Sequence, residues 1–299
     1  MLSQFLKKKR NKKKMALGLI GYHPKRYVPD SKCSLSIEDC VIGLRNGDIL
    51  LVCSNSFASS IVNEVCSSRF SHVGVIFVDQ SGKRWVLESI KNDDTLPPLV
   101  ERSLGPNVGV RMVELIPYLQ RFNGECIAAR VLQLRKEIGQ DLYVEFDRHM
   151  HAIIEQVYQQ KKGTPYKDDI RDFLTARFGW LGGRPSNDLS TIFCSELVTY
   201  VYKEAGILPD DETIPCQYTP DNYDHASNLQ LVLPPEIQKF CFSGKKKLIK
   251  LSEEKYIQVP SNSRNMSQAY HIFSSYKVKI RGVITFLIVV AFCLYLILI

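Results

Sequence analysis

Two short segments, far apart in the chain, carry residue types that could do covalent chemistry. Cys194 stands where an apolar, helix-periodic stretch begins, and His72 stands at the start of an apolar strand pattern. A thiol and an imidazole brought together by a fold make a nucleophile and its general base. The sequence therefore predicts that Cys194 and His72 form the catalytic pair of a thiol-dependent enzyme.

The residues around Cys194 place it in the first turn of a helix, on the buried side. Apolar side chains follow it at the spacing of one helical face: Leu197, Val198, Val201 and Ala205. Polar residues that can act as N-caps precede it: Asp188, Ser190 and Thr191. The positive end of the helix dipole favours the thiolate form there. Taken alone, however, a cysteine in such a pattern is more often a core residue than a nucleophile.

Glu88 is a third candidate, because it is a carboxylate inside the otherwise apolar strand pattern of residues 85–90. A hairpin turn at 79–83 joins this strand to the His72 strand, residues 72–78. A three-residue loop around Ser81 puts His72 and Glu88 on one face of the hairpin, whereas a two-residue loop puts them on opposite faces. The sequence leaves both registers open. On a shared face Glu88 would orient the imidazole; otherwise it is an edge charge facing water.

The elements that must position these residues follow from hydrophobic periodicity. Strands are expected at 49–53, 72–78, 85–90, 109–113 and 127–132. Helices are expected at 56–67, 114–121, 141–160, 169–178 and 194–205. This order predicts an α+β fold, with an antiparallel sheet and helices packed on it.

Five segments, taken in this order, resemble the circularly permuted branch of the NlpC/P60 superfamily. That branch of papain-like cysteine hydrolases includes YiiX-like bacterial proteins and a poxvirus group. The segments cover roughly residues 44–225, and they are 46–50, 71–75, 87–89, 163–166 and 193–197. The resemblance implies a permuted papain-like fold, with Cys194 as nucleophile, His72 as base and Glu88 as orienting residue. It also matches Tyr166 to a recurrent tyrosine near the family's site, which implies a role in substrate binding.

The same superfamily contains lipid acyltransferases and phospholipases related to lecithin–retinol acyltransferase. Those enzymes carry the motif Asn-Cys-Glu-His-Phe, whereas this chain reads Phe-Cys-Ser-Glu-Leu at 193–197. The departure weakens the lipid assignment and leaves it as an alternative.

Charge is concentrated near the N-terminus. The formal net charge is +8, and the run from Lys7 to Lys14 contributes seven positive charges, so the rest of the chain carries 8 − 7 = +1. The nearly neutral remainder gives no reason to expect nucleic-acid binding. The run itself is typical of a solvated tail, with attraction to an anionic lipid surface or a nuclear signal as alternatives.

The C-terminal residues 283–299 contain no charged side chain. Seventeen helical residues would span roughly 26 Å, at the short end of what crosses a bilayer, and Lys277, Lys279 and Arg281 precede them. We therefore expect a transmembrane tail anchor at 282–299, a single pass with the catalytic domain facing the cytosol. The expected organisation is a basic, mostly irregular segment at 1–43, the enzyme domain at 44–225, a linker at 226–281 and then the anchor.

The functional expectation is a membrane-anchored cysteine hydrolase that cleaves amide or ester bonds through an acyl-enzyme. Two alternatives stay open: a phospholipase or acyltransferase acting on membrane lipids, and a catalytically inactive, membrane-tethered adaptor. No metal or organic cofactor is expected. The nine cysteines include no Cys-x-x-Cys pair, and Cys33 and Cys40 lack histidines at metal-ligand spacing.

Overall fold

The computed structural model describes residues 34–53, 70–91, 109–122, 126–133, 140–167, 189–208, 215, 218–224, 229, 231–232, 234, 248–251 and 255–257. All of them belong to one compact unit of the chain, residues 1–259. The basic run at 7–14 and the helices predicted at 56–67 and 169–178 lie outside the described residues.

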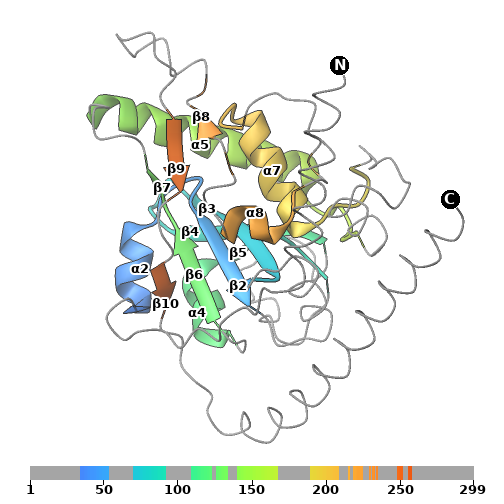
Figure 1. Ribbon diagram of the computed structural model, residues 1–299, viewed down its shortest axis with the longest axis horizontal. Coiled ribbons are helices and arrows are strands. Elements are labelled where there is room, and N and C mark those ends of the chain that lie inside the picture. Colours follow the sequence, from blue (N-terminus) through green and yellow to red (C-terminus); the bar gives the residue numbers. More distant parts are fainter. Residues whose placement is uncertain are drawn as a thin grey trace, which may run out of the picture. The chain divides into compact units, whose positions relative to one another are not determined.

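A seven-stranded sheet forms the centre of the described fold, in the order β1-β10-β6-β2-β3-β4-β5 (Figure 1). Its strands are β1 (Ser34–Leu35), β2 (Ile49–Cys53), β3 (His72–Val78), β4 (Arg84–Ile90), β5 (Gly109–Glu114), β6 (Cys126–Arg130) and β10 (Lys255–Ile257). Neighbouring strands run antiparallel, except that β1 and β10 are parallel. A smaller antiparallel sheet contains β7 (Leu132–Gln133), β9 (Leu248–Leu251) and β8 (Leu231–Val232), in that order.

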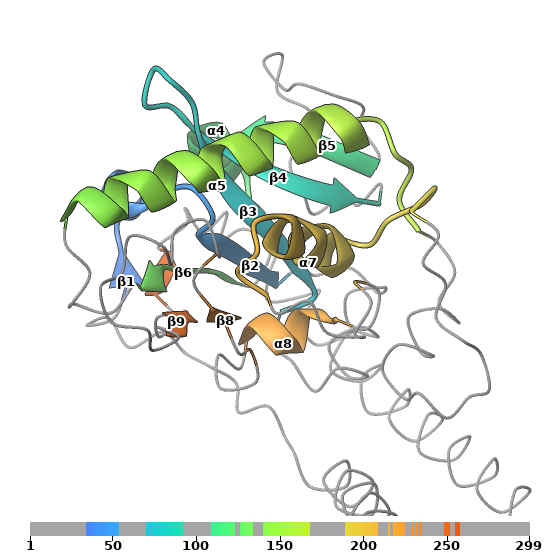
Figure 2. The ribbon, with the colours of Figure 1, turned by 90° about the horizontal axis from the view of Figure 1, so that it is seen from above.

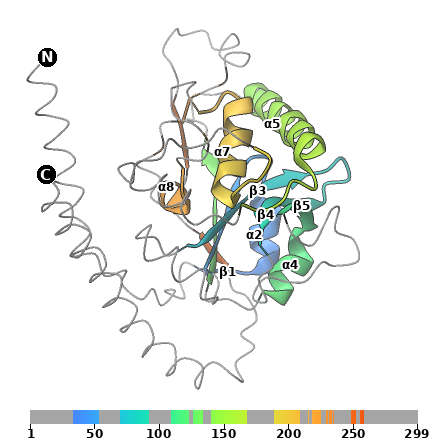
Figure 3. The same cartoon turned by 90° about the vertical axis from the view of Figure 1, so that its right-hand side faces the viewer.

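Two layers of helices cover the two faces of the large sheet (Figure 3). The helices are α2 (Ile37–Gly43), α4 (Leu115–Arg121), α5 (Gln140–Lys161), α7 (Cys194–Glu204) and α8 (Pro220–Asp224). One core cluster joins apolar side chains of α5 and α7 to the sheet face that carries Leu51, Val73 and Leu87. The other joins α2 and α4 to the face that carries Leu50, Ile76 and Val86. The long helix α5 runs beside α7 (Figure 2).

The central strands are apolar in continuous runs because both of their faces are covered. Every residue of β2 is buried, and so are the first six residues of β3 and the last six of β4. The strands predicted at 49–53 and 72–78 are found with those bounds, and the helix predicted at 194–205 ends one residue earlier. The α+β class with an antiparallel sheet is therefore the general architecture of the molecule.

Three strands lie in the segment 226–281 that the sequence suggested is a linker. β10 pairs with β6 and β1 in the large sheet, and β9 pairs with β7 and β8 in the small one. The sheet thus extends beyond residue 225. These strands are two to four residues long, too short for periodicity to reveal.

The prediction of a transmembrane anchor at residues 282–299 has to be corrected. Among the described residues, no helix is both long enough and apolar enough to cross a membrane, and residues 282–299 lie outside that part of the chain. This finding contradicts the transmembrane helix in the predicted fold class and the single-pass, cytosol-facing localisation. The longest described helix, α5, has 22 residues but carries charged side chains such as Glu145, Arg148 and Glu155. The prediction rests on the uncharged stretch at 283–299 and on the basic residues before it, Lys277, Lys279 and Arg281.

Candidate functional site

The helix α7 begins at Cys194, and its start is built by backbone contacts. Phe193 is the N-cap, and its side chain has no hydrogen-bonding atom. The backbone N–H of Phe193 donates instead to Glu196 Oε2 at 3.1 Å, so the third residue of the helix binds back to the cap. The N-caps that the sequence suggested, Ser190 and Thr191, do not fill this position. Cys194 is 4% exposed and lies in the core cluster of α5 and α7.

The hairpin of β3 and β4 has the register that puts His72 and Glu88 on one face. Val75 pairs with Leu87 and Val78 with Arg84, and the N–H of Asp79 donates to the Lys83 carbonyl at 2.9 Å, so three residues, 80–82, form the loop. Gly82 has φ +81°, the left-handed conformation that a three-residue hairpin loop requires at that position. The alternative of a two-residue loop is therefore not the one adopted.

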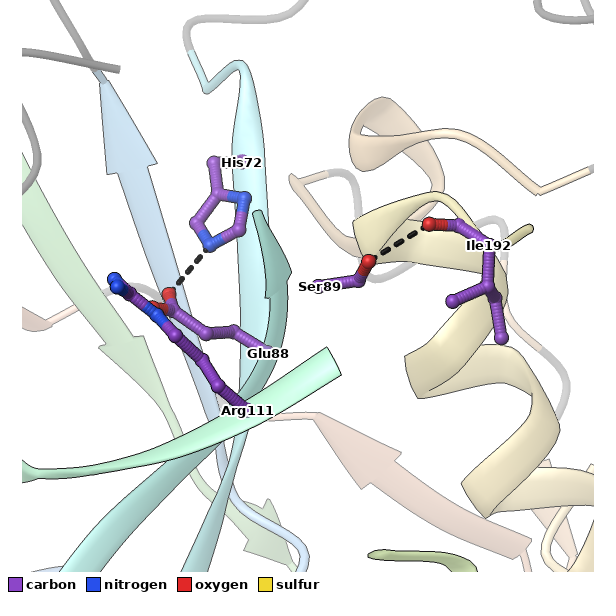
Figure 4. Close-up of polar contacts among 5 residues, drawn as sticks. All are labelled: His72, Glu88, Ser89, Arg111 and Ile192. Carbon is purple, nitrogen blue, oxygen red and sulfur yellow. Dashed lines mark hydrogen bonds and ion pairs between the residues drawn. The ribbon is translucent and has the colours of Figure 1, made fainter. Parts of the chain in front are cut away.

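His72 contacts both other predicted site residues. Its Nε2 lies 2.8 Å from Glu88 Oε2, and the ring is close enough to Cys194 for that side chain to raise the pKa of His72. Because Nε2 is engaged by Glu88, the nitrogen left for the thiol is Nδ1, which points away from Glu88 (Figure 4). The structure thus brings together Cys194, His72 and Glu88, in the order in which a nucleophile, a base and an orienting group stand in a triad.

Arg111 is a member of this cluster that sequence reasoning missed. It stands directly opposite Glu88 in the pairing of β4 with β5, and its Nε and Nη2 donate to Glu88 Oε1 at 2.9 and 2.7 Å. Arg111 is 2% exposed and Glu88 is fully buried. The available signal was a charged residue inside an apolar strand, the same anomaly that singled out Glu88.

The interactions within this cluster favour the charged forms of Glu88 and His72. Burial opposes ionisation of Glu88, but the Arg111 charge, followed by the hydrogen bond and charge of His72, lowers the pKa of Glu88 to about 2. Burial also disfavours a charged His72, yet the charge and hydrogen bond of Cys194, followed by those of Glu88, raise the pKa of the ring to about 10. The arrangement therefore favours an imidazolium at His72 beside the Glu88 carboxylate.

The cluster reaches both sides of the sheet. Glu88 and Arg111 project toward the side of α2 and α4, because they share strand parity with Val86 and Val113 of that core. Ser89 points the other way, and its Oγ donates to the Ile192 carbonyl at 2.7 Å, just before α7 (Figure 4). His72 is the first residue of β3, so it lies at the end of that strand, while Cys194 begins the helix α7, which packs on the opposite face from Glu88.

Gly74 makes room for this arrangement. It is two residues from His72 on the same strand face and stands opposite Glu88. A Cβ at Gly74 would lie 2.6 Å from Val86 Cγ1 and 3.2 Å from the Leu87 carbonyl oxygen, closer than side chains pack. The glycine is therefore a packing requirement of the hairpin that carries the site.

Tyr166 lies in the segment that leads the chain to Cys194. It forms a parallel bridge with Ile192, and its ring packs edge-on against Phe193 with 5.7 Å between centroids. Its neighbours strengthen the pairing, since the N–H of Ile192 donates to the Pro165 carbonyl at 3.0 Å. Tyr166 is half-buried. These contacts position the start of α7, and the implied role of Tyr166 in substrate binding stays a prediction.

Within the described part of the chain, no group of three or more His, Cys, Asp or Glu side chains could hold a metal ion.

The comparisons with known proteins give a likeness to solved structures. No protein-family model and no curated protein matches the chain. The chain is similar to a crystal structure described as metalloprotein YiiX from Escherichia coli O157:H7 (DUF1105), which is 18% identical. The match covers 72% of this chain and 98% of that one, with a TM-score of 0.36. At that TM-score the likeness carries no argument about the fold or the site.

Proposed function

We propose that this protein is a cysteine-dependent hydrolase that cleaves amide or ester bonds. Cys194 is the nucleophile, His72 is the general base and acid, and Glu88 orients and charges His72. The observation that carries the proposal is the position of His72, whose ring hydrogen bonds with Glu88 at 2.8 Å and is close enough to Cys194 for the two side chains to interact electrostatically. Arg111 acts through Glu88, so it is a positioning residue rather than a catalytic one.

The reaction divides into two acyl transfers. The thiolate of Cys194 attacks a carbonyl carbon, a C–S bond forms, and the C–N or C–O bond of the substrate breaks as His72 protonates the leaving amine or alcohol. Water then gives a proton to His72 and attacks the thioester, which releases the carboxylic acid and restores the thiol–imidazole pair. The backbone N–H groups of the first turn of α7 would stabilise the oxyanion of each step.

The finer assignment, a permuted NlpC/P60-type domain, is part of the same proposal. It rests on the five motif segments in their order, and the contacts among His72, Glu88 and Cys194 are those that the motif assignment requires. The substrate-binding role of Tyr166 belongs to this assignment, so evidence against the assignment would also count against that role.

The proposal is tested with a thiol-directed electrophile that carries a neutral acyl group, applied at neutral pH. We expect the probe to label the wild-type protein on Cys194, and the variants Cys194→Ala and His72→Ala to lose at least about 90% of that labelling. Ester and anilide substrates that release a chromophore, assayed with the same variants, would show whether the acyl-enzyme turns over.

Cys53→Ala is the matched control, because Cys53 is also a buried cysteine of the same core cluster. It should keep the labelling of the wild type. Labelling that survives in folded Cys194→Ala would overturn the proposal. A folded wild-type protein with neither labelling nor turnover would instead favour a non-enzymatic role for the scaffold.

A further inference from the structure

Two consecutive residues of β4 hold the two halves of the candidate site from opposite faces of the sheet. Glu88 Oε2 lies 2.8 Å from His72 Nε2, on the side of α2 and α4. Ser89 projects to the side of α5 and α7, because successive side chains of a strand alternate. There its Oγ donates to the carbonyl of Ile192, two residues before Cys194 (Figure 4). The reaction described above uses Glu88 and assigns nothing to Ser89.

The hydrogen bond of Ser89 is completely removed from solvent. The donor and acceptor atoms are 2.7 Å apart, and both residues are 0% exposed, although they lie 103 positions apart in the chain. Leu87, on the same face of the same strand, is an ordinary core residue. A hydroxyl among apolar side chains carries a desolvation cost that only a well-placed acceptor offsets. The bond is therefore a specific tie between β4 and the chain that enters α7.

The peptide of Ile192 is held from its other side as well. Its N–H donates to the Pro165 carbonyl at 3.0 Å, and the preceding residue, Thr164, accepts the N–H of Val110 at 2.9 Å. Val110 stands opposite Ser89 in the pairing of β4 with β5. Backbone contacts thus lead from Ser89 across β5 and along the segment 164–165 to Ile192, and the Ser89 hydroxyl closes this ring.

A single rigid element consequently sets both partners of the proposed catalytic pair. Consecutive residues of a strand are about 3.3 Å apart, and β4 is paired with β3 on one side and with β5 on the other. Glu88 and Ser89 therefore cannot move independently. A nucleophile and its base must meet in a narrow range of geometry, and a shift of about 1 Å can cost roughly a hundredfold in rate.

We propose that Ser89 is a positioning residue for Cys194: its hydroxyl holds the Ile192 peptide, and with it the start of α7, in a fixed place relative to His72. The inference rests on the proposed function, in which Cys194 is the nucleophile and His72 its base. Ser89 acts through the backbone of residues 192–194, so it is not a catalytic residue.

The test measures how fast the neutral acyl electrophile labels Cys194 at neutral pH, resolved for the Cys194 peptide by mass spectrometry. Ser89→Ala removes the hydroxyl, and the labelling rate should fall about tenfold to hundredfold. Ser89→Cys keeps a side chain of similar size with only a weak donor, so its rate should be intermediate. In the His72→Ala background, Ser89→Ala should change the rate by less than about twofold, because no base remains whose position matters.

Tyr202→Phe is the matched control. The Tyr202 hydroxyl is also fully buried, and it also donates to a distant backbone carbonyl at 2.7 Å, that of Gly47. This tie leads from the C-terminal part of α7 to the turn before β2, away from Cys194. Tyr202→Phe should lower the melting temperature by an amount comparable to Ser89→Ala, because each loses one buried hydrogen bond, and should keep the labelling rate within about threefold.

Three results would overturn the inference. One is a labelling rate in Ser89→Ala equal to that of the wild type, and another is an equal loss of rate in Ser89→Ala and Tyr202→Phe. The third is a loss in Ser89→Ala that persists in full in the His72→Ala background, because it would reflect a general disturbance of the fold. Thermal melting shows which variants are folded, and Ser89→Cys carries the same comparisons if Ser89→Ala unfolds.

The same measurements separate this inference from the proposed function. Labelling and turnover that depend on His72 but not on Ser89 would support the hydrolase and contradict the positioning role. Labelling that depends on both residues, with no turnover of any ester or anilide, would support the positioning role and contradict the hydrolase. Labelling that is equally fast in the wild type and in His72→Ala would contradict both.

Discussion

At the scale of single residues, the Glu88–Arg111 ion pair is almost completely removed from solvent. Glu88→Gln would remove the counter-charge of an arginine that is 2% exposed. We expect the free energy of unfolding to fall by about 3–5 kcal/mol, because a buried guanidinium then lacks its partner. Urea unfolding at pH 7 measures this directly. A loss below about 1 kcal/mol would show that the pair is not buried in solution as it is in the structure.

The raised pKa of His72 gives a second expectation, for stability against pH. The folded value of about 10 lies above the ordinary 6.5, so the folded state binds this proton more tightly than the unfolded chain does. The resulting stabilisation is complete below pH 6.5 and is lost as the pH rises from there toward 10. Unfolding free energies of the wild type should therefore decline over that range more steeply than those of His72→Gln. Parallel curves would contradict the charged state of His72.

Residue types alone led to Cys194, His72 and Glu88, because each one breaks or begins an apolar pattern. Arg111 also breaks an apolar pattern. The sequence does not single it out, because its importance depends on the strand pairing that sets it opposite Glu88. The ion pair of Lys167 Nζ with Glu196 Oε2, at 3.8 Å, is likewise not visible in the sequence. Nothing local to either residue shows that the segment 165–167 pairs with the chain before α7.

At the scale of elements, the hairpin of β3 and β4 has to pack tightly at Gly74. Gly74→Ala would bring a Cβ to 2.6 Å from Val86 Cγ1, so the strands must shift, at an expected cost of about 1–3 kcal/mol. The displacement would also move His72 away from Glu88, so Cys194 labelling should fall with it. Labelling and thermal melting of the same sample test both effects.

Gly43→Ala is the control for that variant. Gly43 is the last residue of α2, and a Cβ there meets nothing within 4 Å. Alanine is the better helix former, so this change should leave stability unchanged or raise it by up to about 1 kcal/mol. Equal losses in the two variants would mean that close packing at Gly74 is not what matters.

The hairpin shows where prediction from sequence stopped. Periodicity located both strands, but a loop of two or three residues satisfies it equally well, and the two choices put Glu88 on opposite faces. Asp79 stabilises the three-residue loop. Its Oδ1 accepts the N–H groups of Ser81 and Lys83, and its Oδ2 accepts the Trp85 indole N–H. Such a side-chain network depends on three-dimensional placement, and hydropathy does not report it.

At the scale of the whole molecule, the large sheet is completed by residues far along the chain. β10 lies between β1 and β6, so Tyr256→Pro would remove a backbone donor from the middle of three paired strands. We expect a loss of more than about 2 kcal/mol, against a small change for Tyr256→Thr, which keeps the strand. A proline variant as stable as the threonine variant would show that residues 255–257 add little to the sheet.

His72 lies at the end of the sheet, between groups that come from its two faces. This position has a consequence for how the chain folds. Cys194 acquires its reactive partner only when β3, β4 and β5 are paired and α7 has docked on them. Before that moment it lacks the His72 side chain as a partner. The rate of Cys194 alkylation should therefore change when this arrangement forms. A refolding time course that follows alkylation of Cys194 would report when α7 docks on the paired strands.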